Sequence, residues 1–457
     1  MSASPSPRIV VVTGAAAGIG LATARAFAAA GDRVVLTDLD AATVAARAAE
    51  LGDGHIGLAM DVSDEAAVVA TMAAIAARCG RIDVLVNNAG IVDPHARQLF
   101  DKPMAEMRRL VAVNLDGAFC AAREAGRLMI RQGRGSIVNL SSGAALAALP
   151  GRTPYSMTKA AVLGLTRTLA SEWAADGVRV NAVLPGYVRT EILASLERAG
   201  KFDPHAAGAA VPLGRMAEPA EIAAAILHMA GAGSVSGAAL LADGGVAAYG
   251  GRAAASRGPV SGRSGDGVVL VAGGARGVGA AIADRFVALG RKVVVADDAA
   301  AAIAALPGDR TGIVLDLADE QAIDAAVQGI GPVAVLVNAV PAPKAVTPST
   351  DRSLADFRRG FDAGLMAPLT ITRAVARTMA ARGEGGTIVT VSSPSTEAAA
   401  QAGITMLTKS LACEWAEHNI RVTAVATDPA AAGDAVAFLA SDAASYVTGI
   451  SYGAVGG

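Results

Sequence analysis

Cysteine is scarce in this sequence: Cys79, Cys120 and Cys413 are the three that occur among 457 residues. An odd number of widely spaced cysteines indicates neither a disulfide framework nor a zinc site, and it fits a reducing compartment. We therefore expect a cytoplasmic protein with no bound metal.

The chain also lacks an excess of either charge and a long apolar run near its start. Its 39 basic residues balance 41 acidic ones, which leaves no electrostatic footprint for nucleic acid or anionic lipid. The uncharged stretch 9–24 is shorter than the ~20 residues of a membrane span, and residues 1–7 lack the pattern of a secretory signal. We expect small-molecule partners, with no nucleic acid and no membrane.

Aromatic residues make up 3% of the chain, whereas hydrophobic residues make up 53%, largely Ala and Val, with 52 Gly interspersed. This composition is typical of buried parallel strands covered by closely packed helices. A chain of this length exceeds one ordinary core, and we predict two α/β domains.

The first chemical motif is a glycine loop between a strand at 8–13 and a helix at 21–30. Gly14, Gly18 and Gly20 let backbone N–H groups approach a pyrophosphate at the positive end of the helix. Their spacing departs from the commoner dinucleotide fingerprint. A tight turn without a ligand is the alternative interpretation.

Asp38 ends the next strand, 33–37, and stands 18 residues beyond Gly20. A carboxylate there accepts hydrogen bonds from the ribose hydroxyls of an adenosine and repels a 2'-phosphate. The loop residues 15–17 include no Arg or Lys to receive such a phosphate. We therefore expect NAD, with NADP less favoured; an ordinary exposed strand-end Asp is the alternative.

Amide side chains follow at two further places. Asn87 and Asn88 end the strand in 82–90, where they suit polar contacts to an adenine or ribose. Asn114 lies in a helical pattern over 104–131. A buried Asn in a helix has a hydrogen-bonding duty, either structural or catalytic.

Tyr155 and Lys159 stand four residues apart, so they share one face of a helix predicted over 155–174. A phenol titrates near pH ~10, and holding it ionised near neutrality takes roughly 4 kcal/mol of anion stabilisation. A fixed cation one turn away supplies much of that. Ser142 ends the strand 135–142, 13 residues before Tyr155, and reaches the same edge of the sheet.

A strand at 178–183 and the Pro185-Gly186 corner come next, and the corner redirects the chain across the cofactor edge. Residues 191–216 are polar and poorly periodic, which suits a mobile lid or an ordinary surface loop. The substrate pocket is expected to be shaped by His95, Leu146, Tyr187 and residues 193–216.

Taken together, residues 8–246 resemble a complete short-chain dehydrogenase/reductase. The matching motifs are Thr13-Gly14 through Gly20, Asn87-Asn88-Ala89-Gly90, Asn114, Ser142, Tyr155 with Lys159, Pro185-Gly186 and Asp243-Gly244-Gly245. The resemblance implies that Tyr155 exchanges a proton with the substrate oxygen and that Ser142 hydrogen-bonds that oxygen. It further implies that Lys159 lowers the pKa of the Tyr and holds the nicotinamide ribose, and that Asn114 supports a water relay.

The same resemblance defines the expected cofactor site. The expected cofactor-binding residues are Gly14, Ala17, Gly18, Ile19, Gly20, Asp38, Leu39, Asp61, Val62, Asn88, Ala89, Gly90, Tyr155, Lys159, Pro185, Gly186, Val188 and Thr190. We expect an NAD-dependent oxidoreductase that interconverts a secondary alcohol and a ketone. A 3-oxoacyl-thioester reductase and a non-enzymatic nucleotide-binding protein are the alternatives.

The pattern restarts after a predicted linker at 249–266. A strand and glycine loop recur at 268–279, and Asp297 lies 18 residues beyond Gly279. We predict a tandem duplication of two Rossmann-like doubly wound domains with parallel sheets, covering 1–248 and 267–457.

The second copy has lost the catalytic residues. Aligning Glu414-Trp415 with Glu172-Trp173 puts Glu397 at the place of Tyr155 and Gln401 at the place of Lys159. Gly364 replaces Asn114 while Ser393 persists, so we predict a catalytically silent domain. Whether its loop, with Arg276 beside Gly277, binds a nucleotide stays open.

A silent copy has a structural use in this family, where the helices carrying the Tyr-Lys pair and the Asn commonly pack against their equivalents in another subunit. The helix predicted at 399–416 keeps Leu407, Leu411 and Trp415 at helical spacing, which suits packing. We therefore expect an internal pseudo-dimer of the two halves, and a homo-oligomer of whole chains.

Overall fold

The computed structural model describes residues 7–93, 96–198, 200, 203–211, 213–244, 246–247, 267–341, 347–392, 397–426, 429–441, 444 and 447–452. The predicted linker 249–266, His95, Gly245 and Ser393 lie outside the described residues. Among the helices described, none combines the length and apolarity needed to cross a membrane.

The first half contains a seven-stranded parallel sheet in the order β3-β2-β1-β4-β5-β6-β7. Its strands are β1 (Ile9–Thr13), β2 (Arg33–Asp38), β3 (Ile56–Ala59), β4 (Val84–Asn87), β5 (Gly135–Leu140), β6 (Val178–Pro185) and β7 (Ala239–Ala242). Its helices are α1 (Gly18–Ala29), α2 (Ala41–Glu50), α3 (Glu65–Cys79), α4 (Met104–Val111), α5 (Gly117–Gln132), α6 (Thr153–Trp173), α7 (Glu191–Arg198), α8 (Pro204–Ala209) and α9 (Pro219–Gly231).

Helices cover both faces of this sheet, which explains why its central strands are apolar along their whole length. Val10 and Val12 of β1 face a core shared with α1, α2 and α9. Val11 of the same strand faces the opposite core, to which α3, α5 and α6 contribute. Helix starts are set locally, as where the carboxylates of Asp40 and Asp64 cap α2 and α3.

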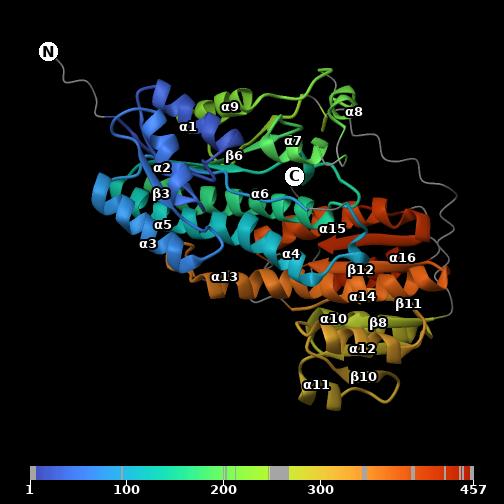
Figure 1. Ribbon diagram of the computed structural model, residues 1–457. Coiled ribbons are helices and arrows are strands. Elements are labelled where there is room, and N and C mark those ends of the chain that lie inside the picture. The colour runs from blue at the N-terminus through green and yellow to red at the C-terminus, as the bar shows by residue number, and fades with distance from the viewer. Residues whose placement is uncertain are drawn as a thin grey trace.

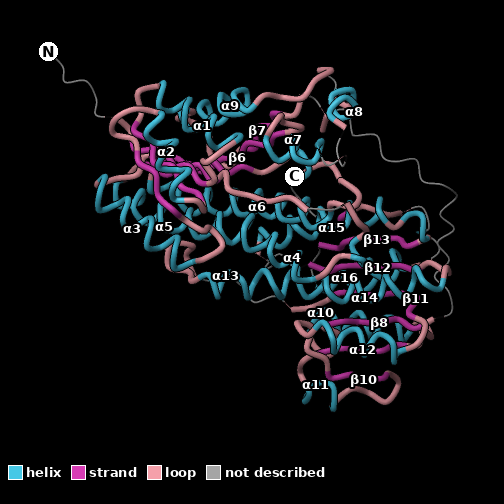
Figure 2. Tube along the Cα trace, viewed as in Figure 1, coloured by secondary structure: helices cyan, strands magenta, loops and turns pink. Residues whose placement is uncertain are grey.

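The second half repeats the same strand order, β10-β9-β8-β11-β12-β13-β14. Its strands are β8 (Val268–Ala272), β9 (Val293–Asp297), β10 (Thr311–Val314), β11 (Val333–Asn338), β12 (Gly386–Ser392), β13 (Ile420–Ala426) and β14 (Ser451–Tyr452). Its helices are α10 (Gly277–Ala288), α11 (Ala300–Ala304), α12 (Glu320–Ile330), α13 (Leu354–Phe361), α14 (Ala367–Arg382), α15 (Ala398–Glu414) and α16 (Pro429–Ala440). Two parallel-sheet α/β domains are thus present, as predicted (Figure 2).

The two halves pack against one another through the helices that the sequence analysis singled out. α6 lies along α15, and Figure 1 shows this pair between the blue-to-green first half and the yellow-to-red second half. One continuous apolar core contains residues of both halves. Across it Phe119 and Phe357 stack with ring centroids 4.1 Å apart. The described contacts therefore make the chain an internal pair of similar domains.

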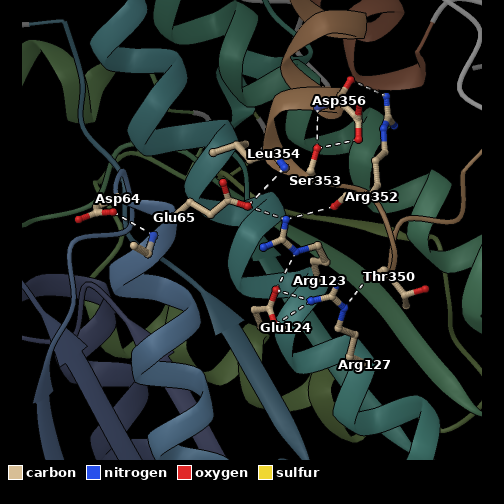
Figure 3. A network of polar contacts seen from close by, with 11 residues as sticks. Asp64, Glu65, Arg123, Glu124, Arg127, Thr350, Arg352, Ser353, Leu354 and Asp356 are labelled. Carbon is tan, nitrogen blue, oxygen red and sulfur yellow. Dashed lines mark hydrogen bonds and ion pairs between the residues drawn. The ribbon is translucent and has the colours of Figure 1, made fainter.

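Polar contacts also join the two halves, and one pair of them is reciprocal. Arg123 donates to the carbonyl oxygen of Arg352 at 3.1 Å, and Leu354 N donates to Glu65 at 3.3 Å (Figure 3). Arg127 donates to the carbonyl of Thr350, while its counterpart Arg377 donates to the carbonyl of Phe100. Such exchange of equivalent contacts is the mark of a two-fold related interface.

Two local expectations need correction. Residues 191–216 are not irregular throughout, because α7 and α8 lie within them; Asp203 caps α8 and Pro204 occupies its first turn. The helical pattern 104–131 is also interrupted by a π-helix at Ala112–Asp116 that separates α4 from α5. A second π-helix occupies the equivalent place in the second half, Asp362–Met366.

Candidate active site

A cavity of about 910 Å³ lies at the carboxyl ends of the first sheet's strands. Every residue predicted to bind cofactor lines it, and so does Ser142. This is the edge at which doubly wound sheets bind ligands. Asn114 does not line the cavity, but it hydrogen-bonds the backbone of Ile91, which does.

The glycine loop is held against the end of β4. Gly14 has φ +64° and Gly18 has φ +56°, a region that favours glycine. A Cβ on Gly20 would lie 2.1 Å from the carbonyl oxygen of Gly14, so a side chain cannot be accommodated there. Asn88 donates from Nδ2 to the carbonyls of Thr13 and Gly14 at 2.9 and 2.8 Å.

The two amides at the end of β4 also make contacts within the protein. Asn88 lines the cavity, but its amide nitrogen is engaged in shaping the glycine loop. Asn87 is buried and donates to Ala118 O at 3.1 Å and to Asn139 at 2.9 Å. Asn87 therefore joins β4 to β5, whereas a cofactor contact by Asn88 stays a prediction.

Asp38 stands at the end of β2 with its carboxylate oriented by the backbone. Oδ2 accepts from Ala16 N at 3.0 Å and Oδ1 accepts from Leu39 N at 2.8 Å. The residue is half-buried and lines the cavity. In the second half the equivalent Asp297 accepts from Ala275 N and Ala299 N and in addition forms an ion pair with Arg276 at 2.8 Å, so its carboxylate is also engaged by a side chain of its own loop.

Tyr155, Ser142 and Lys159 converge at the inner part of the cavity. Tyr155 and Ser142 both line the cavity, and the Ser142 hydroxyl acts to lower the pKa of the Tyr155 phenol. The Lys159 ammonium lies 5.9 Å from the centroid of the Tyr155 ring and donates to Leu140 O at 2.9 Å. Phenol, hydroxyl and ammonium thus come from the start of α6 and the end of β5, as their spacing predicts.

Burial dominates the electrostatics of this cluster. It raises the pKa of Tyr155, while the hydrogen bond from Ser142 acts in the opposite direction. It lowers the pKa of Lys159 to about 8, because an isolated ammonium is costly in an apolar surrounding. Lys159 is not among the groups that shift the pKa of Tyr155 here, so its expected lowering of that pKa stays a prediction.

Asn114 uses its whole side chain to hold neighbouring segments. Its Oδ1 accepts from Ile91 N at 2.8 Å, and its Nδ2 donates to Ile91 O and to Thr158 Oγ1, both at 3.0 Å. It lies in the π-helix, a feature frequent at functional sites. The second half keeps the π-helix but has Gly364 at this place, so the geometry is retained without the amide.

Sequence reasoning missed a buried ion pair beneath the cavity. Lys102 and Asp93 lie 3.0 Å apart and are 1% and 0% exposed. Asp93 also accepts from Tyr155 N at 3.3 Å, and its backbone carbonyl accepts from Arg152. Asp93 follows the Asn87–Gly90 loop closely. Its separation of nine residues from Lys102 matches no regular helix or strand spacing, so the sequence did not predict the ion pair.

The predicted pocket residues have different outcomes. Tyr187 and Leu193 line the cavity. Leu146 is 40% exposed and does not line it, because the short helix Gly143–Ala145 turns it outward. His95 lies outside the described residues.

The second half carries a different group where the Tyr-Lys pair would be. Glu397 directly precedes α15 and is buried in an ion pair with Arg352 at 2.6 Å. Gln401 occupies the place of Lys159 in the first turn of that helix. A carboxylate neutralised by a guanidinium is not a general base, so the residues described here support the predicted loss of catalytic chemistry.

Comparison with known proteins follows the two-half division. Residues 14–247 match the family model described as enoyl-(acyl carrier protein) reductase, and residues 267–437 match the model described as short chain dehydrogenase. An uncharacterized short-chain type dehydrogenase/reductase of Sinorhizobium fredii is 37% identical over 98% of this chain and 86% of its own length.

Relatives of half the length align with part of the chain. Galactitol 2-dehydrogenase (L-tagatose-forming) of Cereibacter sphaeroides is 44% identical over 51% of this chain and 92% of its own length. Among solved structures, ElxO with NADP bound is 29% identical, with a TM-score of 0.51 over 53% of this chain and 99% of that one. The relatives thus include dehydrogenases that act on alcohols.

Proposed function

Because the chain belongs to the short-chain dehydrogenase/reductase family, we propose that its first half interconverts a secondary alcohol and a ketone with NAD. The observation that carries the proposal is the meeting of Tyr155, Ser142 and Lys159 in one cavity with the glycine loop and Asp38. An acid/base, an oxygen-binding hydroxyl and a dinucleotide cradle are the parts such a reaction needs.

The residues present fit a dinucleotide. Gly14, Gly18 and Gly20 line the cavity at the start of α1, where backbone N–H groups suit a pyrophosphate, and Asp38 suits the adenosine ribose. When bound, NAD would supply the hydride acceptor. The carboxylate favours NAD over NADP in this proposal, although a structural relative has NADP bound.

The side chains handle the proton. In alcohol oxidation Tyr155 takes the hydroxyl proton, and Ser142 hydrogen-bonds the same oxygen as charge develops on it. In ketone reduction Tyr155 donates that proton, and its raised pKa keeps the phenol in the donating form at neutral pH. Asn114 holds Thr158 and the backbone of Ile91, which fixes the wall behind this pair.

Replacing the acid/base tests the mechanism. Tyr155→Phe keeps the ring and removes the hydroxyl, so we expect NAD-coupled turnover to fall at least ~10³-fold while the dissociation constant for NAD changes little. Stopped-flow absorbance of NADH and calorimetric titration with NAD measure the two. Tyr452→Phe, in β14 of the second half, is the matched control. Turnover retained in the Tyr155 variant would refute the assigned base.

The substrate is best found by a panel. The cavity accepts a small or medium alcohol, and a polyol such as galactitol belongs in the panel because a relative acts on it. A 3-oxoacyl thioester belongs there as well, since the first-half family model is described as an acyl carrier protein reductase. We expect NAD reduction with a secondary alcohol; activity confined to the thioester with NADPH would favour the reductase.

A further inference from the structure

Glu414 reaches from the silent half into the catalytic half. It is the last residue of α15 and is 6% exposed. Its carboxylate accepts from Thr153 Oγ1 at 2.7 Å, from Gly151 N at 3.2 Å and from Leu99 N. All three donors belong to the first half, so one carboxylate of the second domain holds two separate segments of the first.

Both segments border the candidate active site. Thr153 begins α6, two residues before Tyr155, and Arg152 and Pro150 beside it line the cavity. Leu99 lies between Asp93 and Lys102, whose buried ion pair supports the backbone of Tyr155. Glu414 therefore joins the start of the catalytic helix to the loop that carries its buried support.

The equivalent carboxylate of the first half accepts fewer hydrogen bonds from the other half. Glu172, which aligns with Glu414, is exposed and accepts from Ser349 N at 3.0 Å. Gly151 and Thr153 belong to the loop and helix start of the first copy, the region that the second copy shortened. Of this reciprocal pair, the buried carboxylate with three donors is the one that faces the site with catalytic residues.

A buried carboxylate costs free energy unless hydrogen bonds replace its water. Burial raises the pKa of Glu414, and the bonds from Thr153, Leu99 and Gly151 oppose that rise. A methylene or methyl group in the same place would join the halves without this cost. A buried carboxylate at this place is therefore best explained by a need to hold the backbone before α6 and the first residue of α6 in one position.

We propose that Glu414 is a positioning residue for the active site of the other half, so that the silent domain sets the geometry of the substrate side of the cavity. The proposal rests on the proposed function for the identity of the reaction. It assigns the second domain a part in catalysis that needs no cofactor of its own. A displacement of about 1 Å at reacting groups is enough to reduce rates by orders of magnitude.

Glu414→Ala and Glu414→Gln in the full chain test this, with Glu172→Ala as the matched control. We expect Glu414→Ala to lower kcat/KM for the alcohol at least ~10-fold, Glu414→Gln to lower it less, and Glu172→Ala to leave it within about twofold. The dissociation constant for NAD should stay within about twofold in all three, because the glycine loop and Asp38 lie on β1 and β2, away from the contact.

Hydrogen exchange supplies a readout that does not depend on activity. Amides in 96–102 and 150–156 should exchange faster in both Glu414 variants and unchanged in Glu172→Ala. That result supports the positioning role even if no alcohol in the panel is oxidised, which would count against the proposed function alone. Equal losses in the Glu414→Ala and Glu172→Ala variants, or unchanged exchange and kcat/KM in folded Glu414→Gln, would overturn it.

Discussion

Lys159 is a cation placed in a surrounding that disfavours its charge. Lys159 is 5% exposed, and burial lowers the pKa of its ammonium group from an ordinary value of 10.5 to about 8. The folded protein therefore carries a free-energy cost at pH 7 that an exposed lysine would not carry. Such a cost is expected where a group is kept for function and not for stability.

Removing this charge should stabilise the fold. Lys159→Met is expected to raise the free energy of unfolding at pH 7 by up to ~3 kcal/mol, since each unit of pKa shift is about 1.4 kcal/mol. Because the folded pKa lies below the unfolded one, the wild-type cost is full below pH 8 and fades as the pH rises to 10.5. The gain should fade over the same range, as urea unfolding at pH 7 and pH 9.5 would measure.

Lys102→Met is the matched control for that experiment. Lys102 is also buried but is paired with Asp93, and its loss leaves a carboxylate without its cation. That change is expected to destabilise by ~3 kcal/mol or more. If both variants shift stability in the same direction, the account of Lys159 as an unbalanced charge is wrong.

At the scale of elements, the α6–α15 crossing is the closest approach between the halves. A Cβ on Gly164 would lie 2.2 Å from the carbonyl oxygen of Ala398 in the other half, whereas a Cβ on Gly403 would lie 2.4 Å from Leu365 Cδ2 within the second half. Backbone approaches backbone at the first position, whereas the second meets a side chain that can move. The spacing of the two domains thus depends on the missing side chain at Gly164.

Gly164→Ala should force the two helices apart. Although alanine favours helices, overpacking at a fixed contact typically costs 1–3 kcal/mol, so we expect a thermal midpoint lower by several degrees. Gly231→Ala at the end of α9, where a Cβ meets nothing within 4 Å, is the matched control and should be neutral or slightly stabilising. Differential scanning calorimetry of both variants decides; an unchanged midpoint for Gly164→Ala contradicts the close crossing.

At the scale of the molecule, the two halves share one buried apolar core, which includes Leu165 and Leu169 of α6 and Leu407 and Leu411 of α15. Separating the halves would expose a large apolar surface, and soluble monomers rarely expose such surfaces. The second domain therefore covers an apolar surface of the first. Whole chains are proposed to associate further, through surfaces other than this one.

Residues 1–248 expressed alone should not remain a fully active monomer. We expect self-association through α5 and α6, or precipitation, because the face buried by α14 and α15 would be open. Light scattering measures the state, and the full chain gives the reference, with a multiple of 45.2 kDa expected if it forms a homo-oligomer. A monomeric fragment with the kcat/KM of the full chain would contradict this account.

The sequence determined the two domains, their parallel sheets and the residues that line the cavity, because glycine loops, strand-end acids and a Tyr-Lys spacing are local signals. It predicted the positions of Tyr155, Lys159, Ser142 and Asp38 correctly for that reason. It did not show that the Asn88 amide nitrogen would hold the glycine loop, since local spacing cannot show which partner an amide reaches.

The tertiary structure decided the matters that depend on distant segments meeting. Burial, which sequence alone does not measure, raises the pKa of Tyr155. The Asp93–Lys102 pair and the reach of Glu414 across 261 residues to Thr153 appear when the chain is folded. Sequence specifies which groups exist and in what order, whereas their desolvation and cross-domain contacts arise from packing that no local pattern records.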